Sequence, residues 1–275
     1  MNRMTTRIGL LPPAAFIAVI SLSACSAPAP VPGSEKGAAA SADFRDGRLA
    51  DAESGWERAL AEDRFAVNVP DAVRHLNNLG SMALYDGRLE AAGARFAEAL
   101  DLCVLDDLRE ARGRLQLQLA CVKLRLEDLA GAEGLLEESR AWSDDAGGSD
   151  RAQWRSLKAG LALRRGDTAA AAASARGAHD DAENAEERAA ASVLLGRALE
   201  AEPVAATEAY QSALDDARAA GHLPLAVEAL LGLSRAASHP HAAARFARLA
   251  LDAARAREYE PGRLAAERAL EELRK

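Results

Sequence analysis

The feature that most constrains how this chain can fold is a pattern of small and apolar residues that recurs about every 40 residues. The clearest unit, NNLGSMALYDGRLEAAGARFAEAL, begins at Asn77 and contains Gly80, Gly87, Ala92 and Phe96. Small residues let two helices approach closely, a neighbouring ring fills the gap between them, and glycine permits the turn. Repeated units of this kind are expected to stack as consecutive helical hairpins.

The small residue equivalent to Ala92 recurs in six copies of the unit. These residues are Ala52, Ala92, Ala132, Ala171, Ala206 and Ala243, separated by 40, 40, 39, 35 and 37 positions. The sequence therefore predicts an all-α fold, an α-solenoid of about six helix-hairpin repeats over residues 42–275. Residues 261–275 are expected to form a capping helix at its open end. The alternative interpretation is an unrelated alanine-rich helical bundle.

The composition favours helices throughout. Every isoleucine (Ile8, Ile17 and Ile20) lies near the amino terminus, and the remaining chain relies on Ala, Leu, Arg and Glu. These residues have high helix propensity, whereas the β-branched residues typical of strands are few.

The repeated unit resembles the tetratricopeptide repeat. The shared features are Leu79-Gly80 in the first helix, Gly87 at the turn, and Ala92, Phe96 and Ala99-Leu100 in the second helix. The pair Asn77-Asn78 resembles the longer-period branch found in kinesin light chains. The tetratricopeptide period is about 34 residues, so the longer spacing here predicts longer helices. The resemblance covers residues 42–275 and implies a non-catalytic scaffold for protein–protein interaction.

The amino-terminal segment has the form of an export signal. Arg3 and Arg7 precede an apolar run that ends in Leu22-Ser23-Ala24-Cys25. This ending resembles the bacterial lipobox, which implies that residues 1–24 are a signal peptide and that Cys25 carries acyl chains such as palmitate. Ser26, and not Asp, follows the cysteine. This pattern resembles that of lipoproteins sorted to the outer membrane, where the protein would face the periplasm. Residues 25–41 are expected to be the lipidated cysteine and a flexible tether, because they are rich in Pro, Ala, Ser and Gly.

The charge balance restricts the class of partner. The formal net charge is −8, and loss of residues 1–24, which hold two arginines and no acid, would leave −10. Nucleic-acid binding requires a basic surface, so nucleic acid is not expected as a general partner.

The sequence holds no recognisable catalytic or metal-binding motif. It lacks a phosphate-binding loop, a His-Glu-x-x-His pair, a Gly-x-Ser-x-Gly turn and zinc-spaced cysteines, so we expect no enzyme activity, cofactor or metal. The pair His239 and His241 flanks Pro240 and is typical of a helix start. Cys103 and Cys121 are expected to remain buried free thiols, because their offset on neighbouring helices exceeds the reach of a disulfide.

A repeat array of this kind offers a groove, because the first helix of each repeat lines the concave face. The candidate groove residues are Arg74, Asn77, Asn78, Ser81, Tyr85, Arg114, Gln118, Arg125, Arg155 and Arg164. The five arginines are predicted to form a basic strip, and arginine suits bidentate recognition of carboxylates. In the families it resembles, asparagine in this groove hydrogen-bonds a peptide backbone. The expected partner is a peptide or helix of another envelope protein; the alternative is a small-molecule-binding or transporter-accessory lipoprotein.

Helix 168–179 is almost entirely alanine, so it should bury little apolar area. It should therefore be the part of the array with the lowest local stability. Turn-forming residues at 143–150, 180–185 and 221–224 predict loops, whereas the boundary near 101–108 has neither Gly nor Pro and is not fixed by the sequence.

Overall fold

The computed structural model describes residues 35–45 and 48–274, and these residues form helices joined by short turns. Helices of the first half are α2 (Glu35–Arg45), α3 (Leu49–Ala66), α4 (Val69–Tyr85), α5 (Leu89–Leu105), α6 (Arg109–Arg125), α7 (Leu129–Glu138) and α8 (Arg140–Asp145). Helices of the second half are α9 (Gly148–Arg164), α10 (Thr168–Asp181), α11 (Ala185–Ala198), α12 (Pro203–Ala219), α13 (Leu223–Ala236), α14 (Pro240–Ala256) and α15 (Glu260–Glu272).

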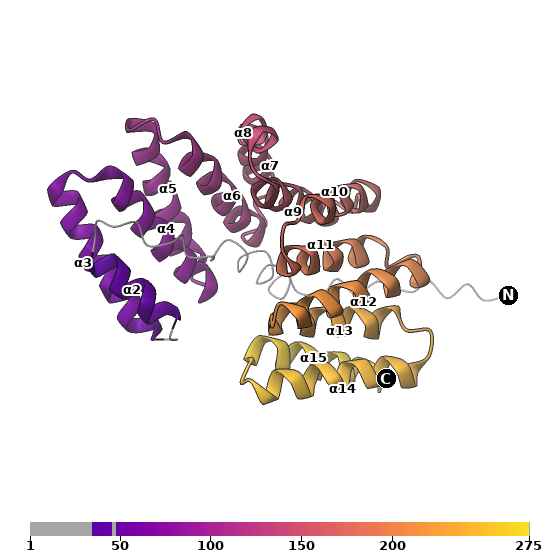
Figure 1. The fold of residues 1–275 in the computed structure, drawn as a ribbon. Coiled ribbons are helices and arrows are strands. Elements are labelled where there is room, and N and C mark those ends of the chain that lie inside the picture. Colours follow the sequence, from indigo (N-terminus) through magenta and orange to yellow (C-terminus); the bar gives the residue numbers. More distant parts are fainter. Residues whose placement is uncertain (1–34, 46–47, 275) are drawn as a thin grey trace.

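Within the described residues the helices pack in sequence order as six hairpins, which confirms the predicted α-solenoid. The hairpins are α2–α3, α4–α5, α6–α7, α9–α10, α11–α12 and α13–α14, and α15 packs on the last of them. Figure 1 shows these hairpins following one another along a curved path from α2 to α15. Several helices are 17 residues long, which accounts for a spacing longer than the tetratricopeptide period.

The repeated small residues lie at the helix crossings, as predicted. All six repeated alanines are buried, each at most 4% exposed. A Cβ placed on Gly80 would lie only 2.5 Å from Cε1 of the fully buried Phe96 ring. Tyr210 has the same role between two hairpins, because its ring lies against both Gly196 and Gly232. Glycine at these positions therefore sets the distance between neighbouring helices.

Seven turns between the described helices share one backbone form. At the end of α4, Gly87 has φ of 77°, and the N–H of Arg88 donates to the carbonyl of Ala83 at 2.8 Å. This is the 6→1 hydrogen bond of a Schellman motif, which ends a helix. The residue just after the helix in this motif has left-handed backbone angles and is usually glycine. Glycine holds this position at Gly87, Gly166 and Gly221, and other residues hold it at Val67, Asp107, Glu127 and Glu258. The boundary near 101–108 is such a turn, with Asp107 in place of glycine, which explains why no turn signal was visible there.

Two segments differ from the sequence prediction. Most of 143–150 is helical, because α8 continues to Asp145 and α9 begins at Gly148, so the predicted loop is wrong there. The turn-forming residues Ser149 and Asp150 instead occupy the first turn of α9, where an acidic side chain stabilises a helix. Residues 35–41 of the expected tether belong to α2, and Ala40 is buried against Gly55 of α3. The signal peptide, Cys25 and the rest of the tether lie outside the described residues.

The apolar core is divided into two large clusters. One runs from Ala40 to Leu161, and the other runs from Ala189 to Ala266. Small clusters dominated by alanine join them, built on α10 residues Ala171, Ala172 and Ala175. Within the described part of the chain, no helix is both long and apolar enough to cross a membrane.

Candidate binding face

The inner side of the array holds a cavity of about 580 Å³, which we call the first cavity. It is lined by the amino-terminal halves of α4, α6, α9 and α11, which are the first helices of four consecutive hairpins. Because side chains three or four positions apart share one face of a helix, each of these helices contributes a short stripe of residues. The predicted groove therefore lies on the helices expected to form it.

Equivalent positions of successive helices line the first cavity. Arg74, Arg114, Gln153 and Ala190 are each the sixth residue of their helix, and all four line the cavity. The stacking of the repeats thus brings together residues that are about 40 positions apart in the sequence.

Three amide side chains face this cavity without a hydrogen bond in the described structure. They are Asn77 of α4, Gln118 of α6 and Gln153 of α9. Gln118 is only 5% exposed. A side-chain amide can donate two hydrogen bonds and accept two. The first cavity therefore presents unused donors and acceptors along three neighbouring helices.

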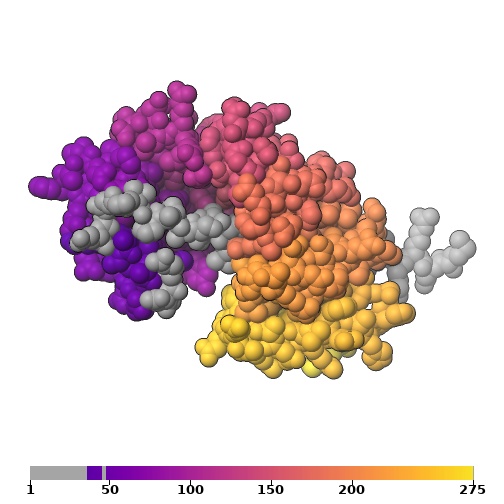
Figure 2. Space-filling model, in the orientation of Figure 1, coloured from indigo at the N-terminus to yellow at the C-terminus, as the bar shows by residue number. Residues whose placement is uncertain are grey.

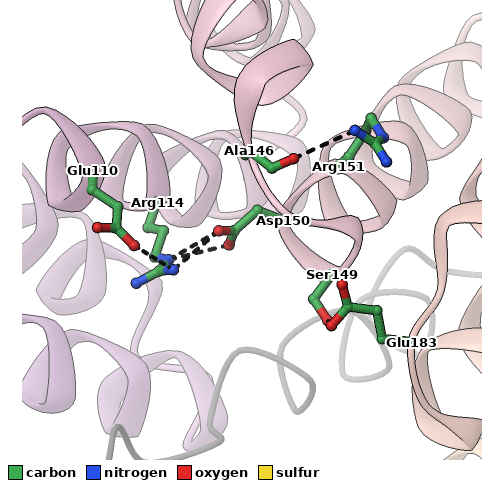
Figure 3. Close-up of polar contacts among 7 residues, drawn as sticks. All are labelled: Glu110, Arg114, Ala146, Ser149, Asp150, Arg151 and Glu183. Atoms are coloured by element: carbon green, nitrogen blue, oxygen red, sulfur yellow. Dashed lines mark hydrogen bonds and ion pairs between the residues drawn. The ribbon is translucent and has the colours of Figure 1, made fainter.

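The two arginines of the first cavity are paired with acids of the same chain. Arg74 forms an ion pair with Asp71. Arg114 donates from Nε and Nη2 to the carboxylate of Asp150 at 3.1–3.2 Å, and its Nη2 lies 2.8 Å from Oε1 of Glu110 (Figure 3). Hydrogen bonding to Asp150 is the main cause that raises the pKa of Arg114.

The close-up also shows how neighbouring first helices are tied together near the cavity. Arg114 of α6 reaches Asp150 of α9, and the hydroxyl of Ser149 donates to Glu183, in the turn before α11 (Figure 3). Polar contacts therefore join α6 to α9 and α9 to the start of α11.

A second cavity, of about 550 Å³, lies between α4, α6, α11, α13 and α15. In Figure 2 the purple surface belongs to the early hairpins, and the orange and yellow surface belongs to the late ones. Tyr85 and Arg125 line this cavity, and Nη1 of Arg125 donates to the carbonyl of Leu84 at 2.7 Å. Burial lowers the pKa of Arg125. Across the cavity, Arg197 and Glu228 form a buried ion pair at 3.6 Å, and burial raises the pKa of Glu228.

The remaining candidates do not line either cavity. Asn78 and Ser81 lie half-buried on α4, outside both linings. Arg155 lies against Gly177 of α10 and pairs with Asp181 at 3.0 Å. Arg164 pairs with Glu127.

The predicted basic strip is therefore wrong. Arg74 and Arg114 face the first cavity, Arg125 faces the second, and Arg155 and Arg164 face neither. All except Arg125 form an ion pair with a described acidic residue. The physical reason is that acids on the preceding or following repeat come within reach once the hairpins stack.

Sequence reasoning did not single out Asp150 and Gln153. Both lie at the start of α9, in or beside segment 143–150, whose turn-forming residues predict a loop. Their register relative to Arg74 and Arg114 is visible only once α9 is known to begin at Gly148.

Other side-chain chemistry is limited. Cys103 and Cys121 are buried free thiols, as predicted, and burial raises the pKa of Cys103 to about 11. No group of three or more metal-ligating side chains occurs among residues 35–45 and 48–274. In comparisons with known proteins, no family description matched the chain and no curated protein was significantly similar to it.

Proposed function

We propose that this protein is a non-catalytic scaffold whose inner face binds an extended peptide or an exposed helix of another envelope protein. The observation that carries the proposal is the row of amides Asn77, Gln118 and Gln153, which face one cavity from three consecutive helices and have no hydrogen bond in the described structure. An extended backbone presents N–H and carbonyl groups at regular intervals, so it can pair with amides placed on successive helices.

The proposal includes membership of the tetratricopeptide-repeat lipoproteins of the bacterial envelope. The repeated Leu-Gly, Ala and aromatic positions support it, and their counterparts Gly80, Ala92 and Phe96 pack as such repeats require. The lipobox-like residues Leu22–Cys25 support lipid anchoring at Cys25, and Ser26 supports the outer membrane.

Capture of partners from the native envelope tests the binding face. The double variant Asn77→Ala with Gln118→Ala removes two of the three amides. Loss of two hydrogen bonds should reduce capture about tenfold or more, since each contributes roughly 1 kcal/mol. Asn78→Ala is the matched control, because Asn78 lies on α4 outside the cavity lining. Equal capture by the wild-type chain and the double variant would contradict the proposal.

The lipid anchor has its own test. Cys25→Ala should abolish metabolic labelling with palmitate and release the chain from the membrane fraction. Unchanged membrane association would contradict the proposed anchor without bearing on the binding face.

A second candidate function is capture of a small molecule. It is favoured by the volume of the first cavity, about 580 Å³, which lies within the usual range for small-molecule sites. Native mass spectrometry of the chain purified from its own cells separates the two: a bound small molecule lost in Gln118→Ala would favour this alternative.

A further inference from the structure

The charge of the first cavity indicates which kind of segment it accepts. Asp150 binds Arg114 through both Nε and Nη2, the paired geometry that an incoming carboxylate would use. Glu110 lies beside the same guanidinium. An acidic ligand would have to displace Asp150 or come close to two carboxylates, and both are unfavourable.

The first cavity has no excess of positive charge, because its two lining arginines are matched by two lining acids. Its two guanidinium groups, Arg74 and Arg114, are accompanied by four carboxylates that either line the cavity or pair with these arginines. The carboxylates are those of Asp71, Glu110, Asp150 and Glu187. Glu187 accepts the backbone N–H of Glu183 and a side-chain N–H of Asn184, so its carboxylate is held in place.

The lining of the second cavity has an excess of acids. Three arginines and five acidic residues line it. Among the acids, Glu258 and Glu272 are exposed and form no ion pair in the described structure, so their charge is uncompensated. Two tyrosines, Tyr85 and Tyr259, also line this cavity, and aromatic rings favour cations at their faces.

Together, these observations point to a cationic ligand. We propose that the segment bound on the inner face is an extended peptide bearing lysine or arginine, and that Asp150 and Glu110 exclude acidic peptides by neutralising Arg114. This inference rests on the proposed peptide-binding function. It reverses the expectation from the sequence, in which the arginines receive the carboxylates of the partner.

Two synthetic peptide libraries test the inference. Both have the same length and the same randomised uncharged positions, and they differ only in carrying lysine or glutamate at fixed positions. The full mature chain is immobilised, and the retained fraction of each library is measured at low and at high salt. The lysine library should be retained at least about tenfold more than the glutamate library at low salt, and the difference should shrink as salt rises.

Variants of the acids identify the residues responsible. Asp150→Asn and Glu110→Gln should each shift retention toward the glutamate library, because each removes one of the two carboxylates that neutralise Arg114. Glu133→Gln is the matched control: it removes a carboxylate paired with Arg165 away from both cavities, and it should leave the preference unchanged.

The possible outcomes separate the two levels of the proposal. Preferential retention of the glutamate library, or a lysine preference that neither variant changes, overturns the charge inference and leaves peptide binding intact. Retention of neither library overturns both.

Discussion

At the scale of single residues, glycine determines how closely neighbouring helices pack. Gly80 has no room for a Cβ because the Phe96 ring lies against it, whereas Gly134 of α7 has open space around it. Gly80→Ala should therefore lower the free energy of unfolding by about 1–3 kcal/mol through overpacking. Gly134→Ala should raise it by roughly 0.5–1 kcal/mol, because alanine loses less entropy in a helix. Urea denaturation of both variants measures the difference, and equal effects would contradict the packing account.

Buried histidine makes stability depend on pH. His75 is 2% exposed, its Nε2 lies 3.2 Å from Oδ2 of Asp63, and Asp71 and Arg74 are the other charged groups nearby. Burial is the main cause that lowers the pKa of His75 below its ordinary value of 6.5. The unfolded chain therefore binds this proton more readily, so the stability from neutral His75 is complete above about pH 6.5 and is lost as pH falls.

The measurement is the free energy of unfolding of the wild-type chain and His75→Gln between about pH 7.5 and 5.5. The decline on acidification should be smaller in the variant, since one of the groups that resists protonation is gone. His222 has a lowered pKa for the same reason and should retain part of the decline. Asp63, whose pKa is raised by burial, acts in the opposite direction because the folded chain binds its proton more readily. Identical pH profiles for the two proteins would contradict the role of His75.

At the scale of helices, the ends are the strained positions. Val67 ends α3 in the left-handed region, with φ of 56°, and its side chain is 79% exposed. A β-branched residue is strained there by about 1–2 kcal/mol, and glycine is not. Val67→Gly should therefore stabilise the chain by roughly 0.5–1 kcal/mol after the entropy of glycine is counted. Thermal unfolding decides the sign, with Gly87→Ala as the reverse control, which should destabilise the chain.

The helices and their pairing could be predicted because the same small residues recur at each crossing. Gly80, Ala92 and Phe96 pack as their spacing indicates. The start of α9 could not be predicted from the sequence, because Gly148, Ser149 and Asp150 are typical both of loops and of helix starts. The state of the groove arginines could not be predicted either, because Arg114 and Asp150 lie 36 positions apart and meet only when the hairpins stack.

At the scale of the whole molecule, the division of the core predicts uneven stability. The two large apolar clusters are joined across α10, whose buried residues are all alanine. Less apolar area is buried there than around Phe96, so α10 should open at a lower free energy than α5. Native-state hydrogen exchange should show faster exchange for amides of 168–179 than for those of 90–100. Equal protection of the two helices would contradict this prediction.

The central claim is that partners bind the inner face made by the first helices. A photo-activated crosslinking residue at Gln153, which lines the first cavity, is compared with the same residue at Gln211, an exposed position on the second helix α12. In cells that make the protein, irradiation should yield a specific adduct from position 153 and none from position 211. An adduct from position 211 alone, or equal adducts from both, would contradict the claim.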